Sequence, residues 1–454
     1  MLRYLLLFSA LAGCADELPG TTPIEDQLHF PMGLAVAGDH LLVVNSDFDQ
    51  RYNAGYVLAL PLAELANKVS AAIPAGAAVV IDKTLPVAGR TRARIPSFGA
   101  DVMVLGSAAP FDVFVASRGL GRVTRLTFDG TQVRCDTAGV AAAKAYDCSP
   151  AHILETHGVD AFGMAFLSTV GRAGLLGVAH LASTATTATV FSTLTMIDLA
   201  EWNERLAAEA AQTDTADPAH ALYIAAEGLS GIVADPGANL FYGSIANGPI
   251  GAGSILPLHV LTSSRAEMQA RVGGGDTLAA GTRGVVLSSD RKRAYVSIRI
   301  RVRDTTGQLS GPTIFNSGIA VIDTTSRVVL SVFEIGQELG KPTLIERNNI
   351  RTLYVPELRS SQLYALDVSA DVPLLRHVID GAFEQNGVRI HLLDTPYELV
   401  VAPAPINGRT LGFVSNFGNS SLAVLDLTDD DPRTHRLLGR IGRALTPDGT
   451  GEAP

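Results

Sequence analysis

Three oxygen-bearing side chains near the N-terminus have the spacing of cation ligands. Asn45, Asp47 and Asp49 lie at positions i, i+2 and i+4, like the first ligands of a calcium-binding loop. Such a loop also has a glycine at its turn and a glutamate that closes it with both oxygens, and neither follows here. We therefore expect a hydrogen-bonded turn and no metal site, and we keep the three side chains as candidates for ligand contact.

A second chemical pattern is an alternation of arginine with apolar residues between positions 298 and 303. Arg299, Arg301 and Arg303 share one face of an extended strand, because side chains alternate along a strand. Such a face could bind an anion, since guanidinium groups match carboxylates and phosphates. The interpretation that we favour is a solvated hairpin face that pairs with acidic residues of this chain.

Residue patterns typical of catalysis are missing from the sequence. It contains no GxSxG nucleophile elbow and no CxxC pair, so no covalently attached haem is expected. His152 and His157 are five residues apart, which places them on opposite faces of a strand and excludes the HExxH geometry. We expect a binding or scaffolding module for a protein or a glycan, with no catalytic residues and no cofactor.

The elements that position these residues are clearest between Gly284 and Gly336. Apolar residues recur there at every second position in short runs that polar turns separate, which is typical of β-strands. We predict four strands in this stretch: Gly284–Ser288, Ala294–Val302, Gly318–Asp323 and Arg327–Glu334.

This four-stranded unit recurs along the chain. Seven segments match its first strand: PMGLAV, SFGADVMVL, AFGMAFLS, LSGIVADP, TRGVVLSS, KPTLIERN and PYELVVAP. Seven more match its second strand: LLVVN, FDVFVAS, LLGVAH, LFYGS, RAYVSI, TLYVPE and LGFVSN. A third series of seven is YVLALP, VTRLTF, LTMIDL, SILPLH, IAVIDT, LYALDV and LAVLDL.

These repeats predict the fold class. A chain of 454 residues is too long for one ordinary core, and a lone four-stranded sheet cannot cover both of its apolar faces. Radial repetition packs each sheet against its neighbours. We predict an all-β, seven-bladed β-propeller of four-stranded blades, with short helical insertions at Pro61–Val69 and Asp198–Gln212. The chain begins with an inner strand and ends with an outer one, so we expect no borrowed strand in the last blade unless Ile24–His29 pairs with it.

The units resemble the blades of YVTN-type and lactonase-like seven-bladed propellers. In those families the repeat runs PxGLAVSPDG, LYVAN, VSVIDTAT and VVATIPVG, and GVVLSSDRKRAYVS and GIAVIDTTSRVVLSVFEIG are similar to it. The resemblance covers residues 29–443 and implies the fold, although a fold does not determine a function. It also implies an alternative function, an envelope hydrolase of lactonase-like type that uses the channel mouth.

In a propeller, the loops between second and third strands share a face with the loops that precede the inner strands, and ligands usually bind there. These two loop series bring Phe162, Lys341 and Tyr397 to that face. The candidate ligand-binding residues are Asn45, Asp47, Asp49, Arg118, His180, Arg283, Arg299, Glu357 and Asn416.

The N-terminus resembles that of a bacterial lipoprotein. A basic start and a short apolar run end in Leu11-Ala12-Gly13-Cys14, which is similar to a lipobox; an ordinary secretory signal is the alternative. The resemblance implies a signal peptide over residues 1–13 and acylation, including palmitate, of Cys14. It also implies a tether over 14–28 and a lipid-anchored place in the bacterial cell envelope. Ala15 after the cysteine favours the outer membrane, on its periplasmic leaflet or its surface.

Cysteine content and charge complete the expectations. Export makes Cys135 and Cys148 a predicted disulfide around a short polar loop. The net charge of −10 argues against nucleic acid as a partner, because affinity for nucleic acid comes mainly from lysine and arginine. We expect a monomer whose partners are the membrane and another envelope protein or a glycan. The tail, 444–454, is expected to be disordered.

Overall fold

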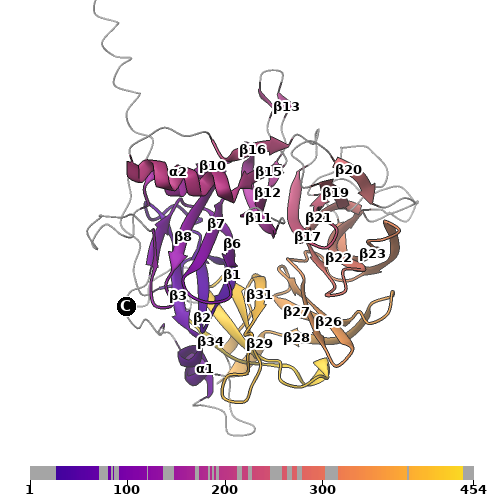
Figure 1. The fold of residues 1–454 in the computed structure, drawn as a ribbon. Coiled ribbons are helices and arrows are strands. Elements are labelled where there is room, and N and C mark those ends of the chain that lie inside the picture. The colour runs from indigo at the N-terminus through magenta and orange to yellow at the C-terminus, as the bar shows by residue number, and fades with distance from the viewer. Residues whose placement is uncertain are drawn as a thin grey trace, which may run out of the picture.

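The computed structural model describes most of the chain between residues 27 and 442. The described residues are 27–70, 80–82, 85, 92–119, 121–135, 148–168, 173–182, 185–186, 189–190, 194–211, 217–222, 228–245, 258–262, 268–272, 279–301, 315–385 and 388–442. They form a β-propeller of mainly four-stranded antiparallel blades around a central axis (Figure 1). The predicted signal peptide, tether and tail lie outside the described residues, apart from the two tether residues 27 and 28.

The first strand of each blade lies at the axis. These inner strands are β1 (Pro31–Ala37), β6 (Gly99–Leu105), β11 (Val159–Leu167), β17 (Leu229–Asp235), β21 (Ala279–Leu287), β25 (Thr343–Arg347) and β31 (Pro396–Val401). Each inner strand contacts the next one along the chain, and β31 contacts β1. The ring is therefore closed, with β1 of the first blade beside β31 of the last blade (Figure 1).

The second and third strands extend each blade outward. The second strands are β2 (His40–Asn45), β7 (Phe111–Ser117), β12 (Leu175–Ala182), β18 (Leu240–Ile245), β22 (Arg293–Arg301), β26 (Ile350–Glu357) and β32 (Leu411–Asn416). The third strands are β3 (Gly55–Pro61), β8 (Arg122–Phe128), β15 (Leu194–Asp198), β19 (Leu258–Thr262), β23 (Phe315–Asp323), β27 (Gln362–Asp367) and β33 (Ser421–Asp426). The predicted second and third strands are confirmed, except that β19 begins later than the predicted SILPLH segment.

The outer strands complete the sheets. They are β5 (Arg92–Ile95), β10 (Ile153–Glu155), β16 (Ala219–Leu222), β20 (Met268–Val272), β24 (Val328–Glu334), β28 (Leu374–Asp380) and β34 (Arg436–Ile441). A short strand, β9 (Val133–Arg134), also pairs with β8. Two small hairpins stand apart: β13 (Ala185–Thr186) with β14 (Thr189–Val190), and β29 (Ala382–Gln385) with β30 (Val388–His391).

Apolar residues on both faces of each sheet explain why the blades pack side by side. On β23, Ile319 and Val321 face one way and join a buried cluster with Leu353 and Val355 of the next blade. Ala320 and Ile322 face the other way, toward Tyr242 of the preceding blade. Full burial of such a side chain contributes about 1.5–3 kcal/mol, so the core of the protein is distributed between the blades.

Glycines in the inner strands allow the blades to approach closely at the axis. A Cβ atom on Gly231 would lie 3.0 Å from the Cα of Gly284 in the next inner strand. A Cβ atom on Gly33 would lie 3.0 Å from the backbone of Asp101. The glycine that recurs early in the predicted first strands is therefore explained by this close approach of neighbouring inner strands.

One strand that takes part in closing the ring was not predicted from the sequence. Between β3 and β5 the chain forms helix α1 (Leu62–Ser70) and then β4 (Val80–Asp82), which pairs in parallel with β34. Leu65 of α1 packs with Phe413 and Ile441 of the last blade. The last blade thus borrows a strand, and the expectation that it would borrow none is wrong; of the segment Ile24–His29, only residues 27–29 are described, and they form no strand.

Other predicted features are confirmed. Helix α2 (Leu199–Ala211) begins within the predicted span and lies across the blades that contain β8 and β15 (Figure 1). Its Trp202 is fully buried with Phe114 of β7 and Leu176 of β12. Cys135 and Cys148 form a disulfide, with their Cα atoms 5.3 Å apart. Two 3-10 turns, η2 (Pro150–His152) and η3 (Pro432–Thr434), complete the elements.

Candidate functional site

The inner strands enclose a cavity of about 90 Å³ at the axis, which we call the axial cavity. Its lining comes from five inner strands, from the segment that leads into β25, and from Leu358 after β26. The chemically active side chains of this lining are Asp101, Ser230, Arg283, Glu338, Lys341, Tyr397 and Glu398, beside Phe162, Met164, Leu339 and Leu358. The cavity therefore opens toward the face on which the sequence placed its candidate residues.

One side of the axial cavity is an ion-paired trio. The Nζ atom of Lys341 lies 3.2 Å from Oδ1 of Asp101 and 2.5 Å from Oε1 of Glu398. The two carboxylate side chains are buried, with 8% and 6% of their surface exposed, whereas the lysine side chain exposes 43%. Lys341 thus pairs with both buried acids and remains partly exposed itself.

The trio connects blades across the axis. The second oxygen of Asp101 accepts a hydrogen bond from the backbone N–H of Met164 at 2.8 Å. The second oxygen of Glu398 accepts one from the N–H of Leu34, also at 2.8 Å. Because the three charged residues and these two donors belong to five different blades, the trio is a structural brace as well as part of the cavity wall.

Burial and mutual charge set the proton affinities in this trio. Burial disfavours the Lys341 ammonium, but the charges of Asp101 and Glu398 outweigh it and raise the lysine pKa. Burial raises the pKa of Glu398, and the charge of Asp101 adds to that effect while Lys341 opposes it. Burial, followed by the charge of Glu398, raises the pKa of Tyr397, whose phenol therefore stays protonated at neutral pH.

Another acid that lines the axial cavity, Glu338, pairs with two arginines. Arg283 and Arg299 each place a guanidinium nitrogen 3.4 Å from Oε1 of Glu338. Side chains of both signs therefore meet at the cavity, and both of these arginine–glutamate pairs are partly exposed.

Aromatic rings complete the wall of the cavity. The guanidinium of Arg118 lies 5.4 Å from the ring centre of Phe162 and pairs with Asp160 at 3.3 Å. The Phe162 ring meets Tyr397 edge to face, with ring centres 6.1 Å apart. Such stacking fixes the arginine beside an aromatic ring at the cavity wall.

The structure separates the predicted site residues into groups. Arg283 lines the axial cavity, Arg299 pairs with a lining residue, and Arg118 stacks on one. The predicted pairing of the arginine face with this chain's own acids is thus seen for Arg299, whereas Arg303 lies outside the described residues.

Four predicted residues are instead buried away from the cavity with structural partners. Asn416 donates to the carbonyl of Leu392 at 2.7 Å, and Asn45 accepts from the backbone N–H of His29 at 2.8 Å. Glu357 accepts from the N–H of Glu338 at 2.9 Å. These side chains fix loops rather than face the cavity, which is why polarity alone misplaced them in the sequence.

His180 is the fourth of these residues. It is fully buried in β12, and its Nε2 pairs with the hydroxyl of Thr195 at 2.9 Å. Burial lowers its pKa to about 4, so the ring is neutral at physiological pH. A neutral, enclosed imidazole of this kind does not contact a ligand at the axial cavity.

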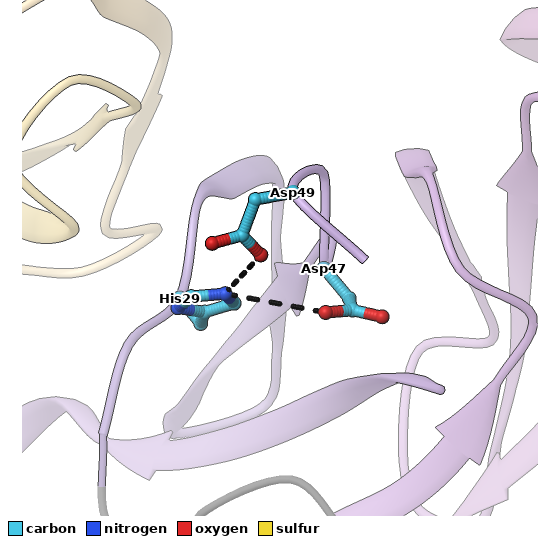
Figure 2. A group of neighbouring side chains, drawn as sticks. All are labelled: His29, Asp47 and Asp49. Atoms are coloured by element: carbon cyan, nitrogen blue, oxygen red, sulfur yellow. Dashed lines mark hydrogen bonds and ion pairs between the residues drawn. The ribbon is translucent and has the colours of Figure 1, made fainter. Parts of the chain in front are cut away.

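The remaining predicted residues, Asp47 and Asp49, form a separate cluster with His29 (Figure 2). The Nε2 atom of His29 lies 2.8 Å from Oδ1 of Asp49 and 4.0 Å from Oδ1 of Asp47. Asn45 takes no part in this cluster, because its oxygen accepts the His29 backbone N–H. The structure thus replaces the predicted set of three oxygens by one imidazole and two carboxylates.

Asp101, Glu398 and Glu338 were missed from the sequence. A signal was present for the first two, since each is a single acid inside an otherwise apolar inner strand: Asp101 in GADVMVL and Glu398 in PYELVV. A buried charge usually has a partner. Its partner here, Lys341, is 240 residues from Asp101 in the chain, so no local pattern connects them.

Similarity to known proteins is confined to the fold. No family model matches the chain, and no curated protein matches it in sequence. Hydrazine synthase of Kuenenia stuttgartiensis superposes with a TM-score of 0.54 at 12% identity, over 90% of this chain and 99% of that chain. The Dos1 propeller superposes with a TM-score of 0.50 at 9% identity, over 95% of this chain and 91% of that chain. The protein is thus a β-propeller, and its function has to be argued from its own residues.

Proposed function

We propose that this propeller is a binding module whose partner protein inserts a polar side chain into the mouth of the axial cavity. The observation that carries the proposal is the presence of charged groups of both signs and two aromatic rings in one lined cavity. Arg283 and Lys341 offer donors for an acceptor group, and Phe162 and Tyr397 offer flat apolar contact. A few convergent polar groups in an otherwise apolar concavity are typical of a binding site.

The size of the cavity favours a protein partner. Pockets that enclose a small molecule measure about 300–1,000 Å³. The axial cavity, at about 90 Å³, instead fits a few water molecules or the end of one side chain. The partner would therefore rest mainly on the loops around the mouth and place one group inside.

The lining favours binding over the alternative, hydrolysis of a lactone or sugar. None of the described residues that line the cavity is a histidine or a cysteine. Its lysine and three acids are held in ion pairs, and Ser230 shares hydrogen bonds with the hydroxyls of Thr282 and Ser244 rather than with a base. A hydrolytic site needs a nucleophile or water next to a group that accepts its proton.

We also infer that the ring has seven blades of the YVTN-type or lactonase-like kind. Seven sheets of four or five strands in the described residues support this count, as does the contact between β31 and β1. The glycine and valine pattern of the inner strands supports the repeat type.

Site-specific photocrosslinking tests the proposed function. A photoreactive phenylalanine analogue would replace Leu358, which lines the cavity, or Ala404, which is exposed beyond the far end of β31. In intact bacterial cells we expect a defined protein adduct from position 358 and none from position 404. Adding Arg283→Ala should reduce the adduct at least tenfold, on the scale of a lost charged contact at a binding site.

Three results would contradict this function. They are adducts of equal yield at both positions, no adduct at position 358, or an adduct that Arg283→Ala leaves unchanged. The thermal unfolding midpoint of the Arg283→Ala variant, measured in parallel, shows that its ring remains folded.

We further propose that Cys14 carries the lipid that anchors this module in the bacterial envelope, in the outer membrane. The lipobox resemblance supports this, and within the described residues no helix is long and apolar enough to cross a bilayer.

Cys14→Ser is expected to abolish labelling by an alkyne analogue of palmitate and to move the protein from the membrane fraction to the soluble fraction. Stable anchoring needs more than one acyl chain, so loss of the acylated cysteine should shift the distribution at least tenfold. A Cys135→Ser/Cys148→Ser variant is the control and should keep the label. Absence of the label from the unmodified protein would point to an ordinary cleaved signal, and labelling that persists in Cys14→Ser would show acylation at another position.

A further inference from the structure

We propose that His29, Asp47 and Asp49 bind one divalent transition-metal ion, for which zinc is the best candidate. One nitrogen and two oxygens from these side chains lie within 4.8 Å of one another. The three side chains converge from the segment before β1 and the loop after β2 (Figure 2). An ion about 2 Å from each atom requires only small side-chain rotations from this arrangement.

The donor set decides which ion is favoured. Calcium takes six to eight oxygen ligands, and the imidazole nitrogen of His29 is a poor substitute for one of them. Zinc, cobalt and nickel accept mixed sets of imidazole and carboxylate, commonly three protein ligands with water at the open position. The structure therefore points away from the calcium loop that the spacing of Asp47 and Asp49 suggests.

The surroundings hold the ligands in place before any ion binds. Asp47 is buried, and its two oxygens accept hydrogen bonds from the backbone N–H of Tyr52 at 3.0 Å and the hydroxyl of Ser97 at 2.9 Å. The His29 ring meets Phe30 and Tyr52 edge to face, each at 4.9 Å between ring centres. Outer partners that orient ligands in this way raise metal affinity.

Electrostatics and access agree with this assignment. Asp47 is buried, and a divalent ion would compensate the charge of its carboxylate. Asp49 exposes 32% of its side chain, which leaves an entry path for the ion on that side. The alternative is an ion pair between a protonated His29 and the two carboxylates, and it predicts no stoichiometric metal binding.

Metal titration of the purified chain distinguishes the metal site from the ion pair. After treatment with a chelator, zinc is titrated by calorimetry, and cobalt is followed by its visible absorption, which reports nitrogen and oxygen ligation directly. We expect one zinc or one cobalt ion to bind per chain, and at least tenfold weaker binding in His29→Ala and in Asp49→Asn. Calcium at the same concentrations should give no saturable signal.

His40→Ala provides the matched control. His40 also pairs with an aspartate, with Nδ1 2.7 Å from Oδ1 of Asp39, but has no third ligand in the described cluster. This variant should bind zinc with unchanged affinity. The proposal is overturned if zinc and cobalt fail to bind stoichiometrically, or if His29→Ala and Asp49→Asn bind them as tightly as the unmodified chain. Because His29 and Asp49 differ in exposure, a folding defect in one variant would not account for weaker metal binding in both.

Discussion

Replacing Lys341 with methionine is expected to lower the free energy of unfolding by about 3 kcal/mol. The substitution leaves Asp101 and Glu398 buried beside each other without a cation, and breaking a buried ion pair in this way costs about 3–5 kcal/mol. We take the lower end of the range because Lys341 reaches solvent through the axial cavity. Urea unfolding monitored by circular dichroism measures the change.

The loss should depend on pH, with a definite sign. Without Lys341, only the hydrogen bond from the Leu34 N–H still opposes the burial that raises the pKa of Glu398 above its ordinary value. An acid whose pKa is higher in the folded state stabilises the fold below its unfolded pKa and loses that contribution as the pH rises through the folded value. We therefore expect Lys341→Met to be more destabilised at pH 8 than at pH 5, and Glu398→Gln to restore part of its stability.

Lys292→Met, in the exposed turn between β21 and β22, is the control and should change stability by less than about 0.5 kcal/mol. A loss of the same size in both variants, or a loss in Lys341→Met that does not vary with pH, would show that the trio does not brace the axis.

Trp202→Ala should destabilise the protein by about 3–5 kcal/mol, the cost of truncating a large buried aromatic residue. The side chain is fully buried, its Nε1 donates to the carbonyl of Ala151 at 2.9 Å, and its ring lies 5.6 Å from that of Phe114. The change would leave a cavity under α2 and an unpaired backbone carbonyl. The thermal midpoint and urea unfolding both report it.

The matched control on the same helix is Glu204→Ala, whose side chain is exposed. Its effect should stay within about 0.5 kcal/mol. If Trp202→Ala were as mild as this control, α2 would be a loosely attached helix available to a partner, rather than the cap of the blades that contain β8 and β15.

Much of the fold could be predicted from the sequence because the determining signal is local. A continuous apolar run such as Ile319–Ile322 marks a strand that is buried on both faces, and polar turns mark its ends. Helix α2 followed from the spacing of Trp202 and Leu206. The borrowed strand β4 could not be predicted, since three residues carry too little pattern and their partner, β34, lies at the other end of the chain.

The candidate site was less predictable. Of the predicted residues, Arg283 lines the axial cavity and Arg299 pairs with a residue of its lining. Polar residues at strand ends, such as Asn45 and Asn416, have the same local signature whether they bind a ligand or a neighbouring backbone group. His29 could not be assigned to the cluster of Asp47 and Asp49, because the fold alone brings it across from the start of β1.

The pairing of β4 with β34 has a consequence for biosynthesis. β4 leaves the ribosome early, but the strand that receives it consists of Arg436–Ile441, among the last residues translated. Until then, Leu65 and Val69 on the apolar side of α1 lack the residues of the last blade that they contact in the folded protein. Folding is completed only when a loop that includes most of the polypeptide has closed. A product that terminates before Arg436 would lack the strand that pairs with β4, and cellular proteases would degrade it in preference to the full-length protein.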